Sequence, residues 1–245
     1  MKKIAAILFL CLITFPILFA QSTDKGKKIP HVLLITGGHD YDEERFEQML
    51  EKLAVTYDHV RHPNAYEMLK ADKIALYDVV LLYDMPKEIS EEAQKDFITM
   101  LEDGMGLVVL HHAFCSYDFW PEYIAITGGR YHHFPWKEND VEKPVSTYKH
   151  DVTFDVKVVD RNHPITRGVE NFRITDETYG GTEILPTVHP LLATDESTSG
   201  ALVCWTNHYR NARVATFTLG HDHLTWKNPA FIRILSQSIR WAASF

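Results

Sequence analysis

Cysteine is scarce in this chain of 245 residues, which holds only Cys11, Cys115 and Cys204. Cys11 lies in a predicted leader, and the other two cysteines are too few for a disulfide scaffold. The sequence leaves open whether Cys115 and Cys204 pair with each other. Internal repeats and domain linkers are also lacking, and 45% of the residues are hydrophobic, so we expect one sizeable core in one domain.

Long hydrophobic runs are limited to Ile4–Phe19, which is too short for a comfortable membrane span. Lys2 and Lys3 precede this run and the small residue Ala20 follows it, which is the pattern of a secretory signal peptide. We therefore expect cleavage after Ala20, export to the periplasm or the extracellular space, and no transmembrane helix in the mature chain. A retained membrane anchor is the alternative.

Basic residues are also fewer than acidic residues. The chain has 25 lysines and arginines against 33 acidic residues, a net charge of −8, and residues 1–20 hold two of the lysines and no acid. Nucleic acids require a basic face, so a nucleic-acid partner is excluded. Residues 21–29 are polar and predict a disordered lead-in, and residues 30–245 are predicted to form the folded domain.

Within that domain, apolar runs typical of buried strands alternate with helical patterns. Strands are expected at 29–36, 55–60, 76–83 and 107–110, and helices from residue 42 and at 91–101. Such alternation implies crossover connections, a parallel sheet and an α/β fold. Further along the chain, strands are expected at 154–159, 191–194, 201–206 and 214–219. Helices are expected at 118–126 and 229–243, and residues 128–148 are predicted to be irregular.

Polar residues gather where the predicted strands end, which is where ligands bind in open parallel sheets. These ends carry His39 and Asp40, Asp84, His111 and His112, and His221, Asp222 and His223. Imidazole is a natural ligand for metals and a proton carrier near neutral pH. Because neighbours in a strand face opposite ways, one of His111 and His112 is expected to be packed in the core. His132 and His133, in a loop, are weaker candidates.

A second candidate stretch is Asp176-Glu177-Thr178-Tyr179. Two adjacent carboxylates can hold a cation, act as acid and base, or simply lie in solvent. Gly180 and Gly181 follow at once, so the acids are expected in a tight turn. Adjacent carboxylates point in different directions, so they make a poor pair for a two-carboxylate glycosidase unless Asp40 or Asp222 is the partner.

The order of these motifs resembles the ThuA-like family over roughly residues 30–243. The resemblance rests on the Gly37-Gly38-His39-Asp40 loop, Gly106–Ala113, Trp120 to Gly128-Gly129, His163-Pro164-Ile165-Thr166, Asp176–Tyr179, and Leu219–Asp222 with Trp226, Pro229 and Arg240-Trp241-Ala242. It implies a flavodoxin-like three-layer sandwich with a mostly parallel central sheet, similar to class I glutamine amidotransferases. It also implies a role in sugar utilisation.

The amidotransferase comparison bears on Cys115. Those enzymes place a nucleophilic cysteine on the sharp turn directly after a core strand. Here His111-His112-Ala113 occupies that turn and Cys115 lies two residues beyond it, so we do not expect a glutamine amidotransferase.

Two classes of function remain. The first is an enzyme acting on a glycoside or keto-sugar of the trehalose-like class, with His111, His221, Asp176, Glu177 and Asp222 as catalytic candidates and a zinc-like divalent metal as a candidate cofactor. Substrate contacts would come from His39, Asp40, His112, Trp120, Trp136, Tyr179 and Trp226. The second is a non-catalytic carbohydrate-binding protein. Convergence of at least three groups from His39, His111, His221 and Glu177 would favour the enzyme; whether the chain forms a homo-oligomer stays open.

Overall fold

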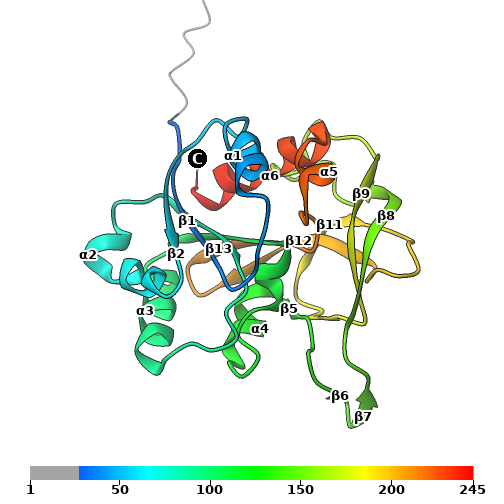
Figure 1. Cartoon of the computed structure of the whole chain (residues 1–245), viewed down its shortest axis with the longest axis horizontal. Coiled ribbons are helices and arrows are strands. Elements are labelled where there is room, and N and C mark those ends of the chain that lie inside the picture. Colours follow the sequence, from blue (N-terminus) through cyan, green and yellow to red (C-terminus); the bar gives the residue numbers. More distant parts are fainter. Residues whose placement is uncertain (1–27, 245) are drawn as a thin grey trace, which may run out of the picture.

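The computed structural model describes residues 28–244 (Figure 1). The predicted signal peptide and most of the predicted lead-in lie outside the described residues. In the part that is described, none of the helices combines the length and the apolar character needed to cross a bilayer.

A sheet of nine strands runs through the described residues, in the order β2-β1-β3-β4-β13-β12-β11-β8-β9. Its first five strands are mutually parallel. They are β2 (Thr56–Arg61), β1 (His31–Gly37), β3 (Val79–Asp84), β4 (Gly106–Leu110) and β13 (Ala212–Phe217). β3 and β4 are buried along their whole length, as their unbroken apolar runs predict.

The other half of the sheet is antiparallel. It consists of β12 (Leu202–Tyr209), β11 (His189–Ala193), β8 (Thr147–Val158) and β9 (Phe172–Gly180). The sheet is therefore mixed, with its parallel half next to an antiparallel extension.

Helices cover both faces of the sheet (Figure 1). On one face α1 (Glu43–Leu50) and α6 (Pro229–Ala242) pack against the parallel strands, and on the other lie α3 (Glu91–Glu102) and α4 (Glu122–Thr127). Asp42, Ser90 and Asn228 cap the first turns of α1, α3 and α6 through side-chain oxygens. The α/β three-layer fold class is thus confirmed.

Two local predictions were wrong. Asp176 and Glu177 lie within strand β9 rather than in a tight turn, because the pairing with β8 continues to Gly180. The stretch 128–148, predicted as irregular, contains β5 (Gly129–Arg130) and the β6–β7 hairpin (Trp136–Glu138 and Val141–Lys143), which projects from the body of the protein (Figure 1).

Short elements make up the rest of the secondary structure between residues 28 and 244. They are the 3-10 helices η1 (Asn64–Leu69) and η2 (His111–Cys115), the helices α2 (Ala71–Ile74) and α5 (His223–Trp226), and strand β10 (Glu183–Ile184). Of these, η2 and α5 matter for the site, because they follow the carboxyl ends of β4 and β13.

Candidate functional site

Three side chains converge where β4, β13 and β9 meet. His111 begins η2 directly after β4, His221 follows β13, and Glu177 lies on β9. The Nε2 atom of His111 is 3.2 Å from Nδ1 of His221 and 3.3 Å from Oε2 of Glu177, and the last two atoms are 2.8 Å apart. We call these three residues the His–Glu–His cluster.

His111 is fully buried and its ring is fixed by a main-chain contact. Its Nδ1 lies 2.7 Å from the carbonyl oxygen of Thr218, which can only accept, so Nδ1 carries the proton. In the neutral ring, Nε2 therefore presents its lone pair to Glu177 and His221. A histidine whose far nitrogen donates to a carbonyl is the usual arrangement behind a metal ligand.

Asp176 fixes the loop that carries His221. Its two carboxylate oxygens accept the N–H groups of Gly220 at 2.7 Å and of His221 at 2.9 Å, and that of Glu177 at 2.9 Å. Burial raises the pKa of Asp176, although the charge of His111 and these N–H donors act in the opposite direction. Asp176 is therefore a positioning residue, because its oxygens are occupied by main-chain donors.

The same loop depends on a glycine. Gly220 has a φ of +121°, and a Cβ there would lie 2.9 Å from Cδ1 of Leu110. Its carbonyl oxygen accepts hydrogen bonds from the Tyr83 hydroxyl and from the Trp226 indole N–H. The chain thus turns tightly after β13 and holds His221 over the end of β4.

The cluster is electrostatically polarised. Burial alone would raise the pKa of Glu177, but hydrogen bonds and charge from the protonated forms of His111 and His221 outweigh burial and hold that pKa well below the usual range. Burial alone would lower the pKa of His221, but the hydrogen bond to Glu177 raises it above the ordinary value. Glu177 is thus an anion at neutral pH, ready to balance a proton or a metal ion.

A second pair of imidazoles lies beside the cluster. His112 is buried, and its ring stacks on His39 at 4.6 Å and packs against Tyr83 at 4.1 Å. Burial lowers the pKa of both histidines, for His112 well below the ordinary value. His111 is therefore the histidine that faces Glu177, whereas His112 supports the half-buried His39.

Of the other residues predicted to contact substrate, Tyr179 lies at the cluster, and the rest lie elsewhere. Tyr179 joins the cluster, since its hydroxyl is 2.9 Å from Nε2 of His111 and burial keeps its pKa well above the ordinary value. Trp120 and Trp226 are buried in the two cores, and Trp136 stacks on His132 at 4.1 Å. Asp40 is exposed, and Asp222 caps α5 by accepting the N–H of Leu224.

Sequence reasoning missed two contributors. The main-chain oxygen of Thr218 has no sequence signature, since any residue supplies it. The sequence does not single out His150 on β8 as a site residue, but its Nδ1 lies 3.7 Å from Oε2 of Glu177 and its ring 4.9 Å from that of His221. Only the register of the β8–β9 hairpin, which shifts between Lys149 and Val152, brings it there.

Neither described cysteine is a disulfide partner. Cys115 and Cys204 are both free and buried, and they belong to the two cores on opposite faces of the sheet. Burial raises the pKa of the Cys115 thiol far above the ordinary value, despite a hydrogen bond from Tyr179. A neutral buried thiol is a poor nucleophile.

The cluster has the donor set and the spacing of a metal site. One imidazole nitrogen each from His111 and His221 and one carboxylate oxygen from Glu177 lie within 4.8 Å of one another. Ligands at the usual zinc distances and tetrahedral angles are about 3.4 Å apart, close to the separations of 2.8 to 3.3 Å found here. Two histidines and a carboxylate leave further coordination positions for water or substrate.

The fold and this cluster define the protein's class: an α/β protein of the amidotransferase-like architecture in which imidazoles and a carboxylate, rather than a thiol, occupy the strand ends. A protein from Thermoplasma acidophilum, described as part of a GMP synthase, has the same fold. Its TM-score is 0.51, with 15% identity over 89% of this chain and 96% of that one.

Two bacterial proteins described as ThuA-like are more similar in structure. One from Parabacteroides merdae has a TM-score of 0.74 and 20% identity, covering 89% of this chain and 91% of that one. One from Bacteroides uniformis has a TM-score of 0.68 and 17% identity, covering 88% and 93%. None of the curated proteins matches the sequence significantly. The family model ThuA, trehalose utilisation, matches residues 31–242, so the chain belongs to that family.

Proposed function

We propose that this protein is a metal-dependent enzyme that acts on a glycoside or keto-sugar of the trehalose-like disaccharide class. One observation carries the proposal: His111, His221 and Glu177 bring three ligand atoms together within 4.8 Å in a largely buried setting. This convergence favours an enzyme over a non-catalytic sugar-binding protein, which has no need of it. Membership of the trehalose-utilisation family supports the substrate class.

In this proposal, a divalent ion of the zinc type is held by His111, His221 and Glu177. When bound, such an ion polarises a carbonyl or hydroxyl oxygen and makes water more acidic. The remaining work falls to the chain's own groups. Asp176 and the Thr218 carbonyl orient the two histidines, and the anionic Glu177 offsets positive charge in a largely buried site.

His39 is the proposed proton acceptor. Its Nδ1 lies 2.7 Å from the backbone oxygen of Asp40 and donates to it, which leaves Nε2 with a free lone pair. Burial lowers the pKa of His39, so the ring is neutral near pH 7 and can take a proton. His112, stacked at 4.6 Å, fixes the plane of the His39 ring.

The proposal is tested first by metal content. Protein dialysed against zinc or manganese should retain about one ion per chain by elemental analysis, and His111→Ala, His221→Ala and Glu177→Gln should each lose it. His132→Ala is the matched control, because His132 pairs with Glu183 at 2.8 Å elsewhere on the chain. Normal metal retention by His111→Ala would contradict the proposed site.

Turnover is tested separately on a panel of glycosides and 3-keto-glycosides, trehalose and its keto derivative included. Loss of turnover by about a hundredfold or more in His111→Ala and His221→Ala is expected, with turnover unchanged in His31→Ala, because His31 begins β1 at the other end of the strands. If the folded variants turn over the panel as well as the parent, the enzyme proposal fails.

We also propose export, supported by the lysines and the apolar run at the start of the chain. N-terminal sequencing of the protein recovered from a secreting host should begin at Gln21. A start at Met1 would contradict it.

A further inference from the structure

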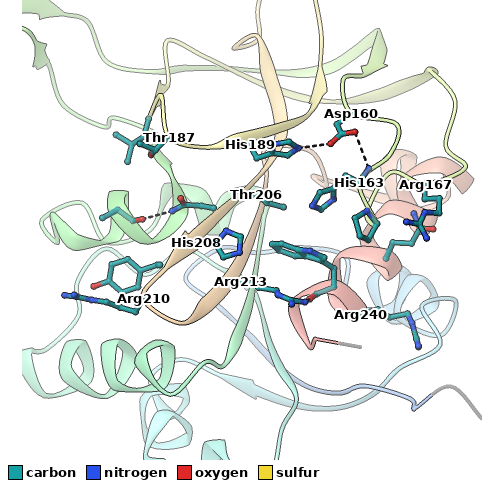
Figure 2. Close-up of a pocket in the computed structure, with 17 residues that line it drawn as sticks. Asp160, His163, Arg167, Thr187, His189, Thr206, His208, Arg210, Arg213 and Arg240 are labelled. Atoms are coloured by element: carbon teal, nitrogen blue, oxygen red, sulfur yellow. Dashed lines mark hydrogen bonds and ion pairs between the residues drawn. The ribbon is translucent and has the colours of Figure 1, made fainter.

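A wide pocket lies away from the His–Glu–His cluster. It has a volume of about 1380 Å³ and is formed by the loop after β8, by β11, by the turn between β12 and β13, and by the end of α6 (Figure 2). Arg213 lies near the start of β13, whereas His221 follows the end of that strand. Strand residues rise about 3.3 Å each, so roughly 15 Å or more of strand separates the pocket from the cluster.

The lining of this pocket is basic in a chain that is acidic overall. It contains four arginines and three histidines, and Asp160 is the one carboxylate among its described lining residues; the basic residues are Arg167, Arg210, Arg213, Arg240, His163, His189 and His208. Figure 2 shows them around the cavity, with Arg210 at one end, Arg167 and Arg240 at the other, and Arg213 between. These basic residues gather in one pocket although the whole chain has a net charge of −8.

Most of this positive charge is not neutralised. Arg213 donates to the main-chain oxygen of Trp241 at 3.0 Å and lies over the Trp241 ring, and Arg240 donates to the main-chain oxygen of Lys28 at 3.2 Å. Among the described residues, Arg210 has a carboxylate partner, Glu102, at 3.6 Å, and Arg167 has no ion-pair partner. Main-chain carbonyls thus position two guanidinium groups without cancelling their charge.

We propose that this pocket binds a small molecule that carries a phosphate or sulfate ester. Guanidinium groups bind tetrahedral oxyanions through pairs of parallel N–H donors. An oxyanion of this kind presents acceptors in all directions, which suits basic groups that approach from several elements; a carboxylate presents only two oxygens. The pocket is larger than the anion alone needs, and Trp241 offers an apolar wall for the organic part of the ligand.

The test measures pyrophosphate binding by titration calorimetry on full-length mature protein, after removal of metal with a chelator so that the anion cannot report on a bound ion. Wild type should bind pyrophosphate, and Arg167→Gln/Arg240→Gln should bind at least about tenfold more weakly. Arg45→Gln/Arg173→Gln is the control with the same loss of charge, since both residues form exposed ion pairs outside the pocket.

Two further variants keep the test decisive. Arg167→Gln alone removes a side chain without an ion-pair partner among the described residues, so folding should survive if the double variant misfolds. His111→Ala should bind pyrophosphate like wild type, because the cluster is remote.

Competition with sulfate distinguishes the two kinds of ester. A dissociation constant for sulfate within about tenfold of that for pyrophosphate points to sulfate esters as well, and a larger preference for pyrophosphate points to phosphate esters. No binding by wild type at millimolar pyrophosphate, or equal binding by the pocket and control variants, would overturn the proposal.

Discussion

His111 donates its Nδ1 proton to the main-chain carbonyl oxygen of Thr218 at 2.7 Å, which ties the end of β4 to the end of β13. Because the acceptor belongs to the backbone, the side chain of Thr218 is not needed for the contact. Thr218→Val should therefore leave metal affinity within about twofold of wild type, whereas His111→Ala should abolish it. Calorimetric zinc titration of both variants checks this, and a Thr218→Val protein that cannot bind zinc would contradict it.

Asp176 is expected to act on stability through the backbone. In Asp176→Asn one oxygen becomes an NH₂ group that faces a main-chain N–H, so a buried donor loses its acceptor. The expected cost is about 1–3 kcal/mol in the free energy of unfolding, measured by urea denaturation. The matched control is Asp155→Asn on the neighbouring strand, whose exposed pair with Arg173 is worth less than about 1 kcal/mol. Equal stability of the two variants would remove Asp176 from its positioning role.

Alanine substitutions at Gly220 and Gly104 distinguish two effects of an added methyl group, which are backbone strain and steric contact. Both have positive φ, +121° and +91°, so alanine strains the backbone at each. At Gly220 the new Cβ also lies 2.9 Å from Leu110, whereas at Gly104 its nearest neighbour is 3.8 Å away. Gly220→Ala should lose about 1–3 kcal/mol more stability than Gly104→Ala. Gly220→Ala should also bind zinc more weakly than wild type. Thermal unfolding and zinc titration test this. Similar losses of stability in the two variants would show that the turn at Gly220 can accommodate a methyl group.

The fold was largely readable from the sequence because its signals are local. The apolar runs of β3 and β4 and the helical patterns that form α1 and α3 depend only on nearby residues. The rule that ligands meet at the carboxyl ends of strands then predicted His111 and His221 together.

The rest of the site was not readable, because it depends on pairing between distant segments. Glu177 was singled out, but its strand conformation depends on pairing with β8 about thirty residues earlier. His150 approaches Glu177 only through a register shift in the same hairpin. Asp176 and Glu177 look equivalent in sequence, yet alternation along β9 turns one toward the loop N–H groups and the other toward the histidines.

The thiol of Cys115 should be inert in the native protein. Its side chain is 4% exposed, and burial raises its pKa so that little thiolate forms near neutral pH. A thiol reagent such as DTNB should label Cys115 only after unfolding, and Cys115→Ser should keep zinc affinity and turnover within about twofold of wild type. Rapid labelling of the native protein together with loss of turnover would instead restore a nucleophilic role.

Asp160 offers a test of pH dependence at the basic pocket. Its carboxylate accepts the N–H groups of Asn162 and His163 and pairs with His189 at 2.9 Å, and these contacts lower its pKa below 3.8. The folded state thus binds this proton less tightly than the unfolded chain does. The stability contribution is complete above about pH 3.8 and is lost as the pH falls through the lowered pKa.

Asp160→Asn keeps an acceptor oxygen but removes the charge. It should therefore be less stable than wild type by under about 1 kcal/mol at pH 5–7, because the group is partly exposed, and the difference should shrink as the pH falls below about 3.8 and through the lowered pKa of Asp160. Urea unfolding across this range measures it, with Asp155→Asn as the control. Removal of the one lining carboxylate should also tighten pyrophosphate binding, since it no longer opposes the positive charge of the pocket. A stability difference that does not shrink as the pH is lowered from 3.8, or weaker pyrophosphate binding, would contradict these roles of Asp160.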